Sequence, residues 1–147
     1  MLLVFQLRRL RLTVSALSVA TLFVVIVGSV AAQSTDIRFS TPVRTNAAAG
    51  TIAARDIGDA RLTDHFYQFA GNPGDFLVTV ESRNLNGDFD IFTARELRPL
   101  LKITVYAETG SPVTKSIYLR KHENLILRVE ARSPNDDNGS YEIRFSG

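Results

Sequence analysis

The stretch DHFYQFAGNPGDFLVTVES, residues 64–82, carries the clearest structural pattern in the chain. Tyr67 and Phe69 are separated by one polar residue, so both rings lie on the same face of an extended chain. After NPGD (72–75), apolar residues recur at every second position from Phe76. Proline fixes φ at the second position of such a turn, and glycine accepts a positive φ at the third. The stretch therefore predicts two half-buried strands, joined either as a hairpin or as a corner between two sheets.

The two-residue period continues to the end of the chain. Apolar and polar residues alternate in five further segments, at residues 88–91, 101–106, 117–120, 125–130 and 141–146. Turn-forming clusters rich in Asn, Asp, Gly and Pro separate them, at residues 84–87, 110–112 and 133–140. Ahead of residue 64 the strand patterns are weaker and cover residues 36–40 and 50–57, with a loop expected between them. Short strands at this spacing predict an all-β protein, an antiparallel β-sandwich or barrel.

The last two expected strands are predicted to be neighbours. Arg128 and Glu130 would then face Glu142 and Arg144 on the outer surface of the sheet. Opposite charges facing each other across two strands contribute ~0.2–1 kcal/mol for each pair. Such pairs would help to fix the register of the two strands.

The first 32 residues have the layout of a secretory signal peptide. Arg8, Arg9 and Arg11 precede an uncharged apolar run that ends in the small residues Val30-Ala31-Ala32. A run of about 20 apolar residues can also span a bilayer. An uncleaved anchor in the inner membrane, with its arginines on the cytoplasmic side, is therefore the alternative. Both forms export the rest of the chain, to the periplasm or the extracellular space, and the membrane is contacted only through residues 1–32 if they are uncleaved.

The part of the chain that follows this leader is close to neutral. The whole sequence has 17 basic and 15 acidic residues, and three basic residues but no acidic one lie in the leader. The exported part thus has 14 basic and 15 acidic residues, a net charge of −1. Nucleic acid is not expected as a partner, because capturing it requires a clustered basic face. With no cysteine in the sequence, stability must come from a buried core.

The sequence motifs resemble the bacterial pre-peptidase C-terminal domain. The resembling residues are Asp64, Tyr67, Phe69 and Gly74-Asp75, then GDFDIF (87–92), then LILRVEA followed by GSYEIRF at the end of the chain. The resemblance implies a jelly-roll-like β-sandwich with its core at residues 64–147, preceded by strands and loops at 33–63. Such domains usually accompany secreted hydrolases, mostly proteases, as removable or accessory modules. Some bind calcium and some bind extracellular polymers. Here we expect the module to stand alone behind the signal peptide.

Catalytic motifs are absent from the sequence. His65 and His122 are the only histidines, cysteine is missing, and no G-x-S-x-G nucleophile motif occurs. A catalytic triad is recognised by its geometry and not by the presence of three residue types. We therefore expect a protein that is not an enzyme. The alternative, a small hydrolase, predicts that His65 or His122 is hydrogen-bonded to a serine in a pocket.

Calcium is the candidate metal, and no cofactor is expected to be required. Calcium prefers oxygen ligands, which Asp88 and Asp90 on one strand face, or Asp136 and Asp137 in the last loop, could supply. Neither group has EF-hand spacing, and clusters of Asn, Asp and Gly are also the ordinary composition of solvated turns. Zinc is not expected, since neither histidine lies in a zinc-binding motif.

Three aromatic residues form the candidate ligand face. Phe92, Tyr106 and Tyr118 are predicted to point outward, where they would make a platform for sugar or peptide or pack against loops. The basic residues are spread along the sequence, which predicts a solvated surface and not a polyanion site; they are Arg95, Arg98, Arg120, Lys121 and Arg128. The sequence thus favours an exported, non-catalytic accessory module that binds a protein or polysaccharide of the cell envelope or extracellular space. An N-terminally anchored structural protein of the envelope is the alternative.

Overall fold

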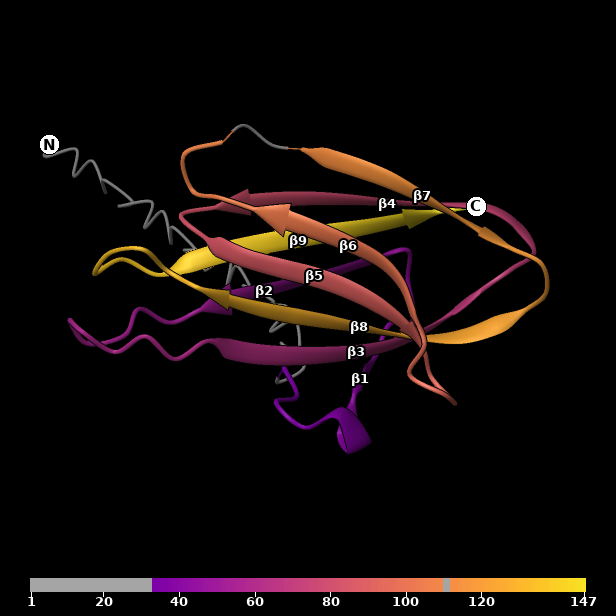
Figure 1. Cartoon of the computed structure of the whole chain (residues 1–147), viewed down its shortest axis with the longest axis horizontal. Coiled ribbons are helices and arrows are strands. Elements are labelled where there is room, and N and C mark those ends of the chain that lie inside the picture. Colours follow the sequence, from indigo (N-terminus) through magenta and orange to yellow (C-terminus); the bar gives the residue numbers. More distant parts are fainter. Residues whose placement is uncertain (1–32, 110–111) are drawn as a thin grey trace, which may run out of the picture.

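The computed structural model describes residues 33–109 and 112–147, so the expected leader (1–32) and two residues of one expected turn (110–111) lie outside it. The described part is built from strands, with one short 3-10 helix (Figure 1). In chain order the elements are η1 (Ile37–Phe39), β1 (Thr41–Pro42), β2 (Ala47–Ile52), β3 (Thr63–Gly71), β4 (Gly74–Arg83), β5 (Asn86–Thr93), β6 (Pro99–Val105), β7 (Val113–Leu119), β8 (Glu123–Arg132) and β9 (Gly139–Ser146).

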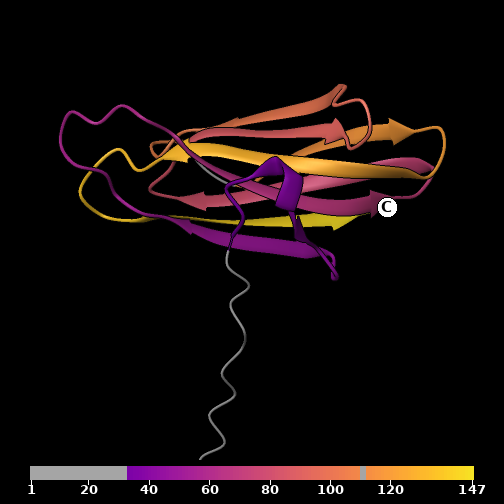
Figure 2. The ribbon, with the colours of Figure 1, turned by 90° about the horizontal axis from the view of Figure 1, so that it is seen from below.

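The strands form two sheets packed face to face. One sheet has the order β1-β3-β8-β5-β6 and the other has the order β2-β9-β4-β7. All neighbours are antiparallel except β1 and β3, and the strands of both sheets run along one long axis (Figure 2). Only β5 and β6 follow each other within one sheet; every other connection crosses to the other sheet. Strands β2 to β9 thus have the arrangement of an eight-stranded jelly roll, which confirms the predicted antiparallel β-sandwich.

The opening stretch forms a corner between the two sheets. β3 pairs with β8 in one sheet, whereas β4 pairs with β7 and β9 in the other. Gly74 at the start of β4 has a φ of +118°, a conformation that residues with a side chain rarely adopt. The alternation on either side of the turn therefore buries one face of each strand against the opposite sheet.

The predicted pairing of the last two strands is wrong. β8 lies between β3 and β5, and β9 lies between β2 and β4, so they belong to different sheets. Arg128 instead donates to Asp90 on β5 at 2.8 Å, and Arg144 donates to Glu142 on its own strand at 2.7 Å. Alternation identifies the buried face of a strand but carries no information about which strand lies beside it.

The N-terminal segment also differs from expectation. Residues 37–39 form a 3-10 turn instead of a strand, because the Asp36 carboxylate caps it by accepting from the Arg38 amide at 2.9 Å. β2 begins three residues earlier than expected, within the alanine-rich segment for which the sequence predicts a loop. Its small residues are required there, because a side chain at Gly50 would collide with the hydroxyl group of Tyr141.

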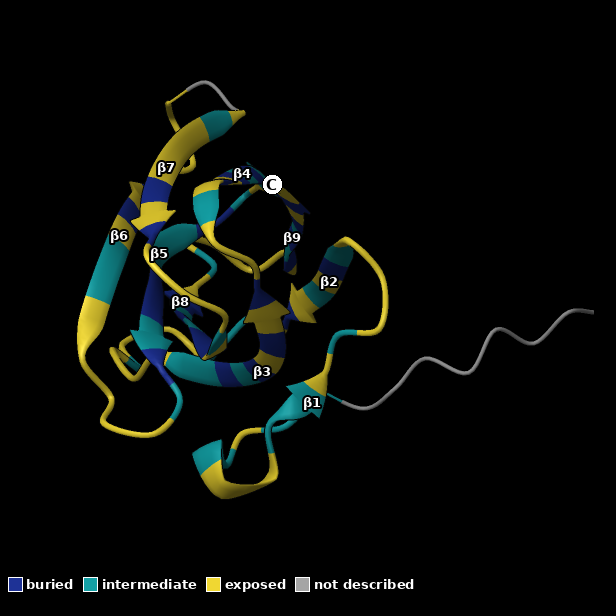
Figure 3. Ribbon diagram, turned by 90° about the vertical axis from the view of Figure 1, so that its right-hand side faces the viewer, coloured by how far each residue is buried: buried dark blue, intermediate teal, exposed yellow. Residues whose placement is uncertain are grey.

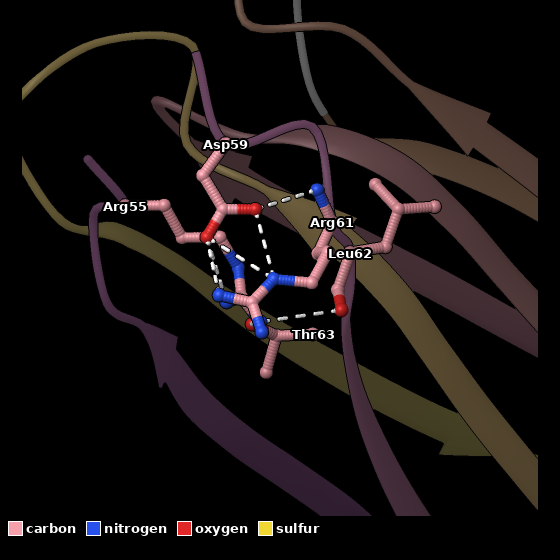
Figure 4. A network of polar contacts seen from close by, with 5 residues as sticks. All are labelled: Arg55, Asp59, Arg61, Leu62 and Thr63. Carbon is pink, nitrogen blue, oxygen red and sulfur yellow. Dashed lines mark hydrogen bonds and ion pairs between the residues drawn. The ribbon is translucent and has the colours of Figure 1, made fainter. Parts of the chain in front are cut away.

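Charged residues hold the long connection between β2 and β3 at one end of the sandwich. The carboxylate of Asp59 accepts from Arg61 at 2.7 Å and from Arg55 at 3.4 Å, and Arg55 also reaches Thr63 at 3.1 Å (Figure 4). The hydrogen bonds from Arg61 hold the pKa of Asp59 well below its ordinary value. Side-chain hydrogen bonds therefore stabilise this connection, although it contains no strand.

The core lies between the two sheets (Figure 3). Tyr67, Phe69 and Tyr141 are all buried, as the two-residue period predicted. Three phenylalanines stack at one end of the core, where the ring of Phe145 lies 4.3 Å from that of Phe69 and 5.9 Å from that of Phe76. Because the three rings come from both sheets, this stack ties the two layers together.

Candidate functional site

A concave site with several cations in its lining lies on the flank where two edge strands meet. β6 is the edge of the five-stranded sheet, β7 is the edge of the four-stranded sheet, and the two lie beside each other (Figure 3). A pocket of about 660 Å³ opens at one end of this flank, and a second of about 350 Å³ shares part of its lining. We call the two together the β6/β7 groove. Its lining includes four cations, two carboxylates and an aromatic ring: Arg95, Arg98, Arg120, Lys121, Glu96, Glu123 and Tyr118.

One side of the groove is formed by the tight connection between β5 and β6. Thr93 is buried and closes this turn, because its carbonyl accepts from Leu97 at 2.9 Å and its hydroxyl accepts from the Arg98 amide at 3.0 Å. The Ala94 amide donates to the Asn124 carbonyl at 2.8 Å, which attaches the turn to β8. Leu97 has a φ of +52°, an uncommon conformation for a leucine. These hydrogen bonds thus hold the backbone of the turn that carries Arg95 and Arg98.

The other side is formed by the end of β7 and the connection that follows it. Alternation along β7 directs Leu119 into the core and Tyr118 outward, where 70% of the tyrosine surface is exposed. Arg120 and Lys121 come next in the chain, and Lys121 lies 3.6 Å from the Glu123 carboxylate. The groove therefore combines an exposed aromatic ring with several cations.

Most cations of the groove have no partner. Within the described residues, the guanidinium groups of Arg95, Arg98 and Arg120 take part in no hydrogen bond and no ion pair. Other unpaired arginines of the described part line separate hollows elsewhere on the surface: Arg44, Arg83 and Arg132. The prediction that the basic residues are scattered is thus wrong for the four cations of the groove, although all four are exposed, as the prediction of a solvated surface requires. The sequence could not show this grouping, because the connection after β5 and the connection after β7 are far apart in the chain but meet at one end of the sandwich.

The three predicted ligand-face aromatics lie in three different places. Only Tyr118 lines the groove. Tyr106 is 57% exposed but follows the far end of β6. Phe92 lies on the outer face of the five-stranded sheet, where the Arg128 guanidinium covers its ring at 5.5 Å. The structure therefore does not assemble one platform from these residues.

Asp88 and Asp90, the first pair of calcium candidates, share one strand face but are held by cations. Asp88 lies 3.0 Å from Lys102 and accepts from the Thr104 hydroxyl at 2.6 Å. Asp90 is only 5% exposed and accepts from Arg128 at 2.8 Å. Burial alone would raise the pKa of Asp88, but the hydrogen bonds from Thr104 and Lys102 outweigh it, and the pKa lies below its ordinary value. A calcium ion at this place would have to displace these partners.

Asp136 and Asp137, the second pair, lie in the exposed loop between β8 and β9. This loop is organised by Asn84, whose side-chain amide donates to the Asn135 side chain at 2.8 Å and to the Asp137 carbonyl at 3.0 Å. In residues 33–109 and 112–147 no three His, Cys, Asp or Glu side chains are grouped as metal ligands. Calcium binding stays a prediction.

The two histidines have no serine partner in the described part of the chain. His65 is buried, and its Nδ1 lies 2.7 Å from the Tyr141 hydroxyl; His122 lies 3.3 Å from the Asn72 side chain. Tyr141 in turn bonds Tyr67 at 2.6 Å, and Tyr67 donates to the Ala49 carbonyl at 3.2 Å. Burial and the neighbouring Tyr67 raise the pKa of Tyr141. Sequence analysis missed this network. The signal that could have found it is the period of two, which puts His65 on the same strand face as Tyr67.

No protein-family model matches the chain, and no curated protein is similar to it in sequence. The likeness to the pre-peptidase C-terminal domain therefore stays a prediction. The described residues contain no helix that is long and apolar enough to cross a membrane. The fold and the site together define a jelly-roll β-sandwich with a basic, aromatic groove on one flank.

Proposed function

We propose that this protein is an exported, non-catalytic module that binds an anionic partner of the cell envelope or extracellular space in the β6/β7 groove. The observation that carries the proposal is the gathering of the unpaired Arg95, Arg98 and Arg120 with Lys121 beside the exposed ring of Tyr118. This local concentration of positive charge contrasts with the net charge of −1 that remains once the 32-residue leader is set aside.

The groove suits an anionic group for physical reasons. A guanidinium group offers a planar set of donors that matches a carboxylate or phosphate, and such charge-assisted hydrogen bonds are stronger than neutral ones. The guanidinium group of Arg98 has no partner within the described residues to give up on binding. The turn that carries it is already ordered through Thr93, which reduces the entropy lost when a ligand binds.

Sedimentation with an envelope preparation tests this function. We expect the protein to co-sediment with envelope fragments and to be released as the salt concentration rises, because salt screens exposed charges. Replacing both arginines, Arg98→Gln with Arg120→Gln, should abolish retention. The matched control is Arg132→Gln, which removes an unpaired arginine from a separate hollow. Equal retention of the double variant and the control would contradict the proposal.

A further inference from the structure

We infer that the ligand of the β6/β7 groove is a carboxylated polysaccharide, a chain of uronic-acid sugars. This inference rests on the proposed function, since it names the chemical class of the partner for the same groove. It draws on three features: the mixture of charged and apolar surface in the lining, the shape of the groove, and the poor suitability of the β6 edge for pairing with another strand.

The lining combines the two surfaces that an acidic sugar presents. A pyranose ring has a face of C–H groups and an edge of hydroxyl and carboxylate oxygens. Tyr118, Pro99 and Leu100 supply aromatic and apolar surface against which such a face can pack. Arg98 and Arg120 supply donors for the carboxylate and hydroxyl oxygens at its edge.

The shape of the groove suits a chain more than a single small anion. The pocket of about 660 Å³ and the pocket of about 350 Å³ share Thr93, Arg98, Lys121 and Glu123 in their linings, so the two lie next to each other. The larger pocket contains Arg120 and the smaller contains Arg95. Cations are thus distributed along the groove, which matches a polymer with one carboxylate on each sugar.

The carboxylates Glu96 and Glu123 limit how much negative charge the groove accepts. Both line the smaller pocket, Glu123 also lines the larger one, and Glu123 is paired with Lys121. A polymer with a high charge density, such as a polyphosphate, would bring its charges close to these carboxylates. A uronic-acid chain has its single charges separated by neutral ring atoms, so it meets less of this repulsion.

The adjacent strand edge does not favour a peptide. Extended peptides commonly bind by adding a strand to an exposed sheet edge. β6 begins at Pro99, which has no amide hydrogen to donate. Further along β6, the Lys102 carbonyl already accepts from the Lys115 ammonium group at 2.9 Å. Lysine and proline are both devices that protect an edge strand from pairing. Strand addition is therefore disfavoured at this edge, which leaves recognition by side chains, the mode that a saccharide uses.

Isothermal titration calorimetry of the protein with three probes tests the inference. The probes are an oligogalacturonate, a neutral cello-oligosaccharide of equal length, and poly-L-glutamate of similar charge. We expect binding of the oligogalacturonate alone, weakening as the salt concentration rises. Tyr118→Ala should weaken binding about tenfold and Arg98→Gln about tenfold to a hundredfold, as expected for one aromatic and one charge-assisted contact. Arg132→Gln should leave it unchanged.

The outcomes separate this inference from the function on which it rests. If poly-L-glutamate binds, with loss in Arg98→Gln, and the oligogalacturonate does not, the groove binds anions but the saccharide assignment is overturned. If the cello-oligosaccharide binds as well as the oligogalacturonate, the assignment of a carboxylated chain is overturned. If none of the three probes binds, the saccharide assignment is also overturned, and the envelope sedimentation experiment then decides the proposed function by itself. Thermal unfolding of each variant confirms that it is folded.

Discussion

Tyr141 is the residue on which the polar part of the core depends. The Ala49 carbonyl oxygen can only accept a hydrogen bond, so the Tyr67 hydroxyl group donates to it. The Tyr67 oxygen then accepts a hydrogen bond from the Tyr141 hydroxyl group. Because the hydroxyl hydrogen of Tyr141 is already engaged with Tyr67, the Nδ1–H group of His65 must donate to the Tyr141 oxygen. Four groups from both sheets thus form one directional chain of hydrogen bonds inside the sandwich.

Removing one hydroxyl group should break this chain. Tyr141→Phe leaves the buried His65 nitrogen without its acceptor and the Tyr67 oxygen without its donor. Unsatisfied buried polar groups cost about 1–3 kcal/mol, so we expect the free energy of unfolding to fall by that amount in urea titrations. The matched control is Tyr118→Phe on the exposed surface, which should change stability by less than about 0.5 kcal/mol. Equal stability of the two variants would contradict this account of the core.

The buried imidazole of His65 should make stability depend on pH. Burial lowers the pKa of His65 below its ordinary 6.5, and the nearby Asp64 carboxylate only partly opposes this. As the pH falls through about 6.5, the unfolded chain therefore binds a proton more readily than the folded protein does, and stability is lost. We expect urea midpoints to fall between about pH 8 and pH 5 in the wild type. His122→Gln should retain this fall, and His65→Gln should reduce it; identical pH profiles for all three proteins would exclude the mechanism.

At the scale of elements, β9 connects the two layers most directly. It lies between β2 and β4 in its own sheet, and Phe145 near its end stacks on Phe69 from the opposite sheet. The strand thus contributes both to the hydrogen-bonded ladder and to the contact between the sheets.

Loss of the Phe145 ring should destabilise the whole sandwich. Phe145→Ala leaves a cavity among buried rings, and such truncations cost about 3–5 kcal/mol. Phe145→Leu fills part of the space and should cost clearly less, while Ser146→Ala on the exposed side should cost little. The free energies of unfolding from urea titrations check this order. A loss for Phe145→Ala no larger than for Ser146→Ala would show that the stack does not hold the layers together.

Strands could be predicted from the sequence, but their neighbours could not. The period of two located β3, β4 and most later strands, because a strand with one buried face has an apolar residue at every second position. Strand pairing leaves no such local trace, and this is why β8 and β9 were wrongly expected to be partners. The 3-10 turn at residues 37–39 was also missed, since its cap depends on the single residue Asp36.

The groove was even less accessible to sequence reasoning. Its cations come from residues 95–98 and 120–121, which are separated by the whole of β6 and β7. Only the jelly-roll topology brings the connection after β5 and the connection after β7 to the same end of the molecule. Knowledge of that topology is the signal that could have predicted the cluster.

At the scale of the whole molecule, the buried hydrogen-bond chain and the binding groove lie in different parts of the sandwich. The hydrogen-bond chain involves β2, β3 and β9, whereas the groove lies between the edge strands β6 and β7. Changes at Tyr141 should therefore alter stability without altering ligand affinity, and changes at Arg98 should do the reverse. Residues that share no interaction partners usually act independently.

Mapping ligand binding residue by residue by NMR is the most direct test of the central claim, that the β6/β7 groove is the binding site. The protein is titrated with the oligogalacturonate while the amide signals are followed. We predict that the signals that shift belong mainly to Arg98, Leu100 and residues 118–121, and that the signals of β2 and β9 stay in place. Shifts concentrated on β2 and β9, or no shifts at concentrations where calorimetry detects binding, would contradict the account.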